Sequence, residues 1–148
     1  MNTLNEELLA AWLRLSTSVI NSRVVSELSY NESLICNVLY GAMKHHPEEL
    51  LTATDLCNTT KMLKSQMNRT LNQLEKREMI IRQRSESDRR KVFILLNQEK
   101  LSDYEKQHTS ILKLIDGIIA HLGEEKTYET MALFHEISDI ASNLLKEK

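Results

Sequence analysis

Apolar residues recur at helical spacing near the start of the chain. Steps of three to five residues predict one long helix from Leu4 to about Glu27. Its apolar positions are Leu4, Leu8, Trp12, Leu15, Val19 and Val24. A second helix is expected after an N-cap at Asn31. It should end near His45 and His46, because Pro47 disfavours helical dihedrals in the residue before it.

The middle of the chain predicts two shorter helices. Thr52 and Asp55 resemble a capping box, which places a short helix from about Ala53 to Thr60. Another helix is expected from about Lys64 to Arg77, with Met67, Leu71 and Leu74 facing inward. Its other face is rich in amides and suits hydrogen bonding to base edges and phosphates.

The period then changes from helical to extended. Met79 to Arg82 and Lys91 to Leu96 are short runs rich in β-prone residues, which predicts two strands. The polar residues 83–90 lie between them, so the pair reads as a hairpin with a basic tip. After Asn97 the helical pattern returns over residues 98–121 and about 124–146, and Gly123 marks the break between these two helices.

This order of elements predicts a mainly α fold with a small β-hairpin wing. A helix pair followed by a hairpin is a winged helix-turn-helix, which we place at about residues 31–97 of a single domain spanning 1–148. The helices at about 1–28 and 98–148 are too apolar to be left in water. One small winged lobe cannot cover them, so we expect them to be dimerisation helices that pack against a second copy.

Charge is distributed unevenly along the 148 residues. The whole chain carries a formal net charge of −2. Residues 61–91 alone hold ten basic and four acidic side chains, a net charge of +6, and the remainder carries −8. A basic block inside an acidic chain is typical of a polyanion-binding site, although a solvated charged face is the alternative.

Composition narrows the class of protein further. No apolar run approaches the length of a membrane span, and Cys36 and Cys57 form no CxxC motif, so we expect a protein of the reducing cytoplasm. There is no Gly-rich phosphate loop, nucleophile elbow or paired-carboxylate pattern, so we do not expect an enzyme. A helical protein-interaction module is the remaining alternative, but it leaves the basic hairpin unexplained.

Four ordered segments carry a resemblance to a known family. Asp55 to Cys57 matches Glu-Leu-Ala; Lys64 to Arg69 matches a recognition-helix start; Leu74 to Ile80 matches Leu-Glu-x-x-Gly-Leu-Val; Asp88 to Arg90 matches a wing-tip Asp-Arg-Arg. At this spacing the sequence resembles the MarR family (multiple antibiotic resistance regulators), from about residue 51 to 96, with flanking helices of matching order and length. The resemblance implies a homodimeric DNA-binding transcriptional regulator, most commonly a repressor.

The chain departs from the family pattern at the turns. Glu78 stands where the family has Gly, which predicts a non-Gly residue at positive φ. Leu63 replaces the usual Ser at the N-cap before Lys64, which weakens that cap. Leu96 and Asn97 stand where Leu-Thr is common.

Two groups of residues are candidates for DNA contact. We expect Lys64, Ser65, Gln66, Asn68 and Arg69 in the major groove of a pseudo-palindromic operator, where Gln66 or Asn68 would bond adenine and Arg69 guanine or a phosphate. The resemblance implies that Arg90 inserts into the minor groove and that Asp88 orients it. A narrow minor groove attracts arginine. The supporting wing contacts are expected from Arg84, Arg89 and Lys91.

The resemblance also implies an effector. Family members commonly respond to a small anionic or phenolic ligand bound where the dimerisation helices meet the DNA-binding lobe. The candidate walls of such a site are Trp12, Arg14, Tyr40, His45 and Tyr104, and ordinary packing is the alternative for each.

Redox and metal sensing are two further alternatives within the same fold. Cys36 and Cys57 are both expected to be buried, and neither stands at the start of the first helix, where the resemblance would place a sensing thiol. Imidazoles and nearby carboxylates are available at His45, His46, His108, His121, His135, Glu48 and Glu49. The His-rich run of zinc-sensing relatives is missing, so we expect no metal and no cofactor.

Overall fold

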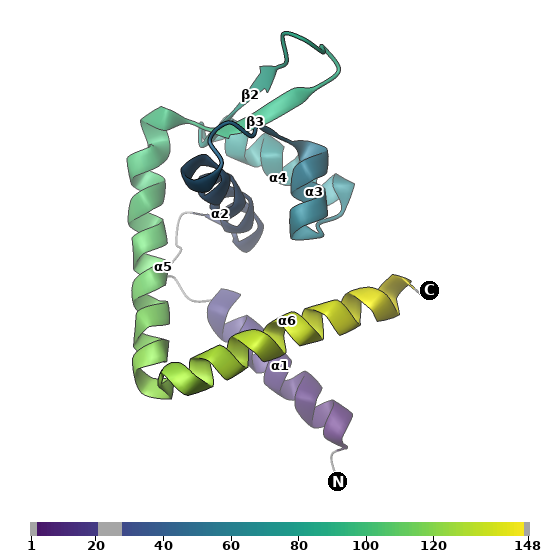
Figure 1. Cartoon of the computed structure of the whole chain (residues 1–148), viewed down its shortest axis with the longest axis vertical. Helices are drawn as coiled ribbons and strands as arrows, with labels where there is room; N and C mark the ends of the chain where they lie inside the picture. The colour runs from purple at the N-terminus through teal and green to yellow at the C-terminus, as the bar shows by residue number, and fades with distance from the viewer. Residues whose placement is uncertain (1–2, 21–27, 147–148) are drawn as a thin grey trace. The chain divides into compact units, whose positions relative to one another are not determined.

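The computed structural model describes residues 3–20 and 28–146 (Figure 1). Within these ranges the predicted order of helices and hairpin is confirmed. The elements are α1 (Leu4–Ile20), α2 (Tyr30–His45), β1 (Leu51–Thr52), α3 (Ala53–Thr60), α4 (Lys64–Lys76), β2 (Ile80–Arg84), β3 (Val92–Leu96), a 3₁₀ turn (Gln98–Lys100), α5 (Leu101–Leu122) and α6 (Glu124–Lys146). The predicted extension of the first helix beyond Ile20, including Val24, lies outside the described residues.

The sheet has three antiparallel strands in the order β1-β3-β2. In the hairpin, Ile80 lies opposite Leu96 and Arg84 lies opposite Val92, so β2 continues two residues beyond the predicted strand end at Arg82. The third strand was not predicted. It consists only of Leu51 and Thr52, which pair with the middle of β3, and two residues are too few to show a period.

The N-cap of helix α2 lies two residues before the predicted one. Ser29 is the N-cap, and Asn31 lies inside the helix, so the prediction of an N-cap at Asn31 is wrong. The Oγ of Ser29 accepts a hydrogen bond from the backbone N–H of Glu32 at 3.2 Å, and the Glu32 carboxylate accepts one from the N–H of Ser29 at 3.0 Å. This reciprocal pair satisfies two backbone donors, which a cap at Asn31 would have left open.

The caps of the next two helices follow the sequence closely. Thr52 and Asp55 form the predicted capping box at the start of α3, and Lys61 ends that helix in the left-handed region with a φ of 65°. Leu63 precedes α4 and has no capping side chain, as predicted. Glu78 adopts the expected positive φ, 62°, in the turn between α4 and β2.

The hydrophobic core belongs to the winged lobe. Helices α2, α3 and α4 pack against one another and against the sheet, and Figure 1 shows the loop between β2 and β3 extending beyond these helices. The three residues predicted to face inward from α4 are fully buried. The remaining largest buried side chains are Ile35, Cys36, Leu56 and Ile80. This packing fixes α4 relative to the hairpin.

The chain divides into two units, residues 1–108 and 109–148, and α5 passes from one into the other. Within the second unit, Gly123 separates α5 from α6 with a φ of 88°, and an added Cβ would meet nothing within 4 Å. None of the described helices is long and apolar enough to cross a membrane.

Large apolar side chains remain exposed on the helices outside the winged lobe. On α1 they are Leu4, Leu8, Leu9, Trp12, Leu13 and Leu15. On the second half of α5 they are Leu112, Leu114, Ile115, Ile118 and Leu122. On α6 they are Tyr128, Met131, Leu133, Phe134, Ile137, Ile140, Leu144 and Leu145. Exposed large apolar side chains in such numbers are typical of an interface.

Candidate DNA-binding surface

Helix α4 presents one polar face. Its buried side is formed by Met67, Thr70, Leu71 and Leu74. At about 100° per residue, the opposite direction is occupied by a run of exposed polar and basic side chains. They are Ser65, Arg69, Asn72 and Lys76. Two candidates from the sequence, Ser65 and Arg69, therefore lie at the centre of the outward face.

The other candidates on α4 lie nearer its edges. Lys64 and Asn68 are exposed, and Gln66 is half-buried. The backbone N–H of Leu63 donates to the Oε1 of Gln66 at 3.2 Å, which is the half of a capping box that does not need a polar N-cap side chain. Bidentate reading of adenine needs a free amide oxygen as well as the amide N–H₂. Gln66 is therefore committed to the helix end before any DNA arrives, and Asn68 is the freer of the two amides.

A side chain from the hairpin reaches the same helix. The Nη1 of Arg82 on β2 donates to the Oδ1 of Asn72 and to the Oε1 of Glu75, both at 3.0 Å. Neither Asn72 nor Arg82 was among the site residues chosen from the sequence. The sequence showed Asn72 on the polar face of the helix and Arg82 in the basic segment 61–91. It could not predict their contact, because no sequence rule pairs residues ten positions apart across a turn.

The wing loop is ordered by hydrogen bonds of its own. Ser85 is buried, and its Oγ accepts a hydrogen bond from the N–H of Asp88 at 3.2 Å. The N–H of Ser85 donates to the carbonyl of Lys91 at 2.9 Å, and the N–H of Lys91 donates to the carbonyl of Asp88 at 3.0 Å. These bonds close the loop on itself and hold its backbone in one shape.

The wing candidates sit around this loop. Arg84, Arg89, Arg90 and Lys91 are exposed, and Asp88 is half-buried. The Oδ1 of Asp88 accepts a hydrogen bond from the backbone N–H of Arg90 at 3.1 Å. Asp88 thus fixes the main chain of Arg90, and this hydrogen bond does not involve the guanidinium. The Nη1 of Arg84 donates to the carbonyl of Arg89 at 2.5 Å, which links the strand to the tip.

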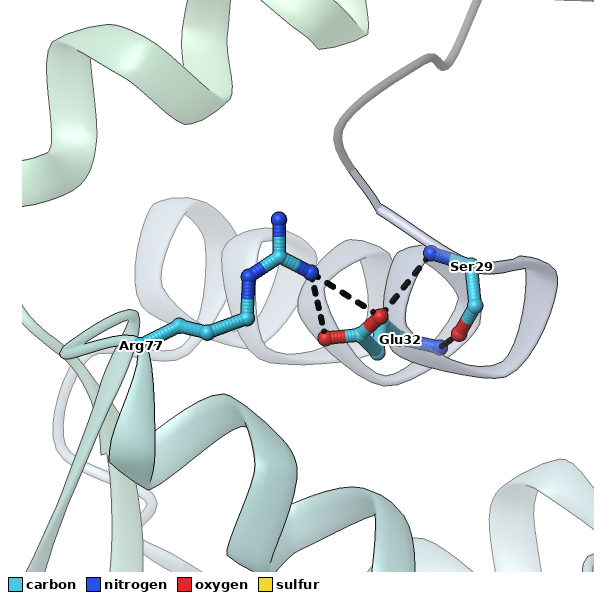
Figure 2. Close-up of polar contacts among 3 residues, drawn as sticks. All are labelled: Ser29, Glu32 and Arg77. Carbon is cyan, nitrogen blue, oxygen red and sulfur yellow. Dashed lines mark hydrogen bonds and ion pairs between the residues drawn. The ribbon is translucent and has the colours of Figure 1, made fainter.

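An ion pair secures the end of α4. Figure 2 shows Arg77, which caps α4, donating from Nη1 to both carboxylate oxygens of Glu32 at 2.9 and 3.1 Å. The Glu32 side chain is only 6% exposed and also accepts the N–H of Ser29, whereas the Arg77 side chain is 42% exposed. The carboxylate therefore joins the start of α2 to the end of α4, which are 45 residues apart.

Two of the five ligand-site candidates lie together. The rings of Tyr40 and Tyr104 are 5.2 Å apart, and the ring of His108 lies within 5.8 Å of both. The hydroxyl of Tyr40 donates to Glu105 at 3.4 Å, and burial raises the pKa of Tyr104. His45 is exposed at the end of α2, and Trp12 and Arg14 are exposed on α1. The structure therefore groups Tyr40 and Tyr104 and adds His108, which the sequence offered only as an imidazole.

A small cavity lies elsewhere in the same lobe. It has a volume of about 70 Å³ and is lined by α2, residues 47–51 and β3. An apolar cavity of about 150 Å³ holds a benzene ring, so this one has about half the volume that an enclosed aromatic ligand occupies there. Its lining, among them Leu39, Met43 and Ile94, does not include any of the five ligand-site candidates.

The two cysteines differ in their surroundings. Cys36 is fully buried as predicted, whereas Cys57 is half-buried, so the prediction that both are buried is wrong for Cys57. Burial, with a smaller contribution from Glu32, raises the pKa of the Cys36 thiol to about 12. At neutral pH this thiol is protonated, and the thiolate is the reactive form.

Among the described residues, one surface turn gathers potential metal ligands. His46, Glu48 and Glu49 offer ligand atoms within 4.8 Å of one another, and all three are exposed. The N–H of Glu49 donates to the carbonyl of His46 at 3.0 Å, so a tight turn already accounts for their proximity. Exposed acidic groups commonly cluster in this way without an ion.

Comparison with known proteins bears on the family and the fold. Residues 21–107 match the family model of the transcriptional regulators SarA/Rot. No individual curated protein is detectably similar in sequence to this chain. Among solved structures, the transcriptional repressor CouR bound to a 23-mer DNA duplex is 19% identical, covers 92% of both chains and superposes with a TM-score of 0.76.

Two further solved structures have the same fold. The PcaV transcriptional regulator from Streptomyces coelicolor, in complex with its natural ligand, is 19% identical over 90% of this chain and 91% of its own, with a TM-score of 0.73. The S. aureus MepR–DNA complex is 16% identical over 97% and 99%, with a TM-score of 0.72. The winged-helix fold that the MarR resemblance implied is therefore confirmed.

Proposed function

Because the chain belongs to the SarA/Rot family of transcriptional regulators, we propose that it regulates transcription as a homodimer bound to a pseudo-palindromic operator. Family and fold together make it a DNA-binding winged-helix regulator of the MarR/SarA type, and the prediction that it is not an enzyme is confirmed. The observation that carries the finer proposal is the presence, in one lobe with a shared core, of the outward polar face of α4 and a basic wing loop closed by its own hydrogen bonds.

In this proposal α4 enters the major groove. Ser65 and Arg69 at the centre of its outward face contact base edges, with Arg69 directed to guanine or a phosphate. Asn68 takes the adenine-reading role in preference to Gln66, because the Gln66 oxygen caps the helix. Lys64 adds charge at the helix start, where it can meet the DNA backbone.

The wing contacts the neighbouring minor groove. Arg90 inserts there, and Asp88 holds the main chain of Arg90 so that the guanidinium is presented from a fixed loop. Arg84, Arg89 and Lys91 contact phosphates on either side. A preordered loop loses less conformational entropy on binding than a flexible one, which favours tight and geometrically selective contact.

The second copy covers the exposed apolar helices. The proposed arrangement is one domain per chain, with a DNA-binding lobe at about 31–97 and dimerisation helices at about 1–28 and 98–148. The apolar side chains exposed on α1, α5 and α6 support this arrangement, because their contact with water is unfavourable. A partner related by a twofold axis would cover them with the same apolar surface. Such a dimer would present its two recognition helices about 34 Å apart.

Regulation by a small ligand is the finer part of the proposal. The Tyr40–Tyr104–His108 cluster supports a small anionic or phenolic effector that relieves repression, with Trp12, Arg14 and His45 as further candidate contacts. CouR is described as a repressor, and PcaV is seen with its natural ligand. We expect the protein to act in the cytoplasm. A phenolic carboxylate such as 4-hydroxybenzoate should weaken operator binding by the parent and less so by a Tyr40→Ala variant.

Selection of bound sequences from a random duplex pool, repeated at two salt concentrations, tests the DNA-binding proposal. The expected result is enrichment of two inverted half-sites about one helical turn apart, with affinity that falls as salt rises. Sedimentation of the full chain at micromolar concentration should give a dimer. A monomer, protection of a single half-site, or an absence of salt-sensitive binding would contradict the proposal, and the last result would favour a protein-interaction module.

A further inference from the structure

The contact between Arg82 and α4 has a chemical consequence for Asn72. One nitrogen of the Arg82 guanidinium lies 3.0 Å from the Oδ1 of Asn72 and 3.0 Å from the Oε1 of Glu75. Asn72 and Glu75 are three residues apart and are therefore neighbours on one side of the helix. The side chain of Arg82 is 29% exposed, so the guanidinium is partly withdrawn from water between β2 and α4.

The partner decides which way the Asn72 amide faces. A guanidinium has five N–H donors and no acceptor, so only the oxygen of an amide can face it favourably. The Nδ2 of Asn72 is consequently turned away from Arg82. Asn72 lies near the centre of the outward face of α4 and is exposed. It therefore presents two N–H donors to whatever approaches that face.

We propose that Asn72 is a specificity-determining residue for DNA and that Arg82 is the positioning residue that turns its amide nitrogen toward the bases. This inference rests on the proposed entry of α4 into the major groove. Donors recognise the acceptor edges of guanine (N7 and O6) and thymine (O4). An asparagine that reads adenine must also accept from N6–H₂, and the Asn72 oxygen is turned toward Arg82 and already accepts one hydrogen bond there, which disfavours that second bond.

The same guanidinium also neutralises Glu75. A free carboxylate on this side of α4 would repel phosphates and would accept from the N4 amino group of cytosine. Its ion pair with Arg82 at 3.0 Å reduces both effects. Arg82 thus binds the oxygen of the Asn72 amide, which leaves the N–H₂ group facing outward, and reduces the effective charge of Glu75. Both effects favour base edges that carry hydrogen-bond acceptors.

The test compares base preferences of the full-length parent and three variants in one selection experiment. Arg82→Met keeps the length of the side chain and removes its donors. At the operator position read by Asn72 we expect the preference to move from guanine or thymine toward adenine by roughly tenfold. Arg82→Lys, which keeps donors and charge, should retain most of the parent preference. Arg82→Met with Asn72→Ala should show no preference at that position.

Salt dependence separates this role from a direct phosphate contact. If Arg82 acts only through Asn72 and Glu75, a chain with Arg82→Met and Glu75→Gln together, which leaves no unpaired carboxylate and no change in net charge, should keep the parent slope of log affinity against log salt. A slope reduced by about 0.9 with unchanged base preference would overturn the inference, because it would make Arg82 a phosphate ligand. An unchanged preference with an unchanged slope would also overturn it. If the parent itself showed no sequence-selective binding, the proposed function would fail and this inference with it.

Discussion

Arg77, the residue that follows α4, donates two hydrogen bonds of 2.9 and 3.1 Å to the carboxylate of Glu32 in the first turn of α2. Removing Arg77 takes two hydrogen bonds from the Glu32 carboxylate, which is the more buried of the two side chains and keeps the bond from the N–H of Ser29. We expect Arg77→Ala to lower the free energy of unfolding by about 1–2 kcal/mol, a figure reduced from fully buried pairs because Arg77 is 42% exposed.

Chemical unfolding of the full chain measures this change. The matched control is Glu75→Gln at the more exposed pair with Arg82, which should cost less than about 1 kcal/mol. Equal losses in the two variants would mean that the Glu32–Arg77 contact contributes no more than an ordinary surface pair.

The buried thiol of Cys36 predicts a loss of stability at alkaline pH. Its pKa rises from an ordinary 9.0 to about 12 in the folded chain, because burial disfavours the thiolate. The unfolded chain releases this proton first as the pH rises. The contribution of Cys36 to stability is thus complete below pH 9 and declines by up to about 1.4 kcal/mol per pH unit until about pH 12.

Comparison of the parent with Cys36→Ala in unfolding experiments from pH 7 to 11 checks this expectation. The variant should be less stable at neutral pH and should show a flatter decline above pH 9. A thiol reagent at pH 7.5 should modify Cys57 before Cys36. Rapid labelling of Cys36 in the folded protein would contradict the assigned protonation state.

Glu78 adopts a backbone conformation that favours glycine. Its φ of 62° brings a Cβ close to the following carbonyl, which glycine avoids. We expect Glu78→Gly to raise the free energy of unfolding by about 0.5–1 kcal/mol. Thermal unfolding provides the measurement, and Glu75→Gly inside α4 provides the control with the opposite sign. Destabilisation by Glu78→Gly would show that the Glu78 side chain contributes more than its backbone costs.

The cap of α4 can be repaired by a single substitution. Leu63 is 67% exposed and supplies no capping oxygen, so Leu63→Ser loses little apolar packing and gains a side-chain acceptor. We expect it to stabilise the protein by about 1 kcal/mol. It should complete a capping box with Gln66, whose side-chain oxygen already accepts the backbone N–H of residue 63, and operator affinity should stay equal to that of the parent. Reduced affinity with increased stability would assign Leu63 a direct contact with DNA.

The wing separates charge from shape. Arg90→Ala should lower operator affinity and reduce the slope of log affinity against log salt by about 0.9, because one positive side chain no longer neutralises phosphate charge. Asp88→Ala should lower affinity through a looser loop, since the bond to the N–H of Arg90 is removed, while the slope stays near that of the parent. Titrations of labelled duplex at several salt concentrations distinguish the effects of the two variants. Identical slopes in the parent and the Arg90→Ala variant would exclude the proposed insertion.

Local chemistry was readable from the sequence, and contacts between distant residues were not. The Thr52–Asp55 box, the strain at Glu78 and the missing cap at Leu63 each depend on neighbours within a few residues, and each was predicted. The cap at Ser29 obeys the same rule, with Glu32 three positions later, but Asn31 was chosen instead. The Glu32–Arg77 and Arg82–Asn72 contacts depend on how helices and strands pack, which a pattern of residue types does not specify.

Gly123 separates α5 from α6 because its backbone adopts a positive φ, and not because the site lacks room for a side chain. The space around it would accept a side chain, yet its φ of 88° excludes nearly every L-residue. An alanine there would favour a right-handed backbone and could fuse helices of 22 and 23 residues into one continuous rod. The mirror-image residue D-alanine would keep the bend, so a semisynthetic chain carrying it should assemble as the parent does, whereas the L-alanine chain should form a different oligomer.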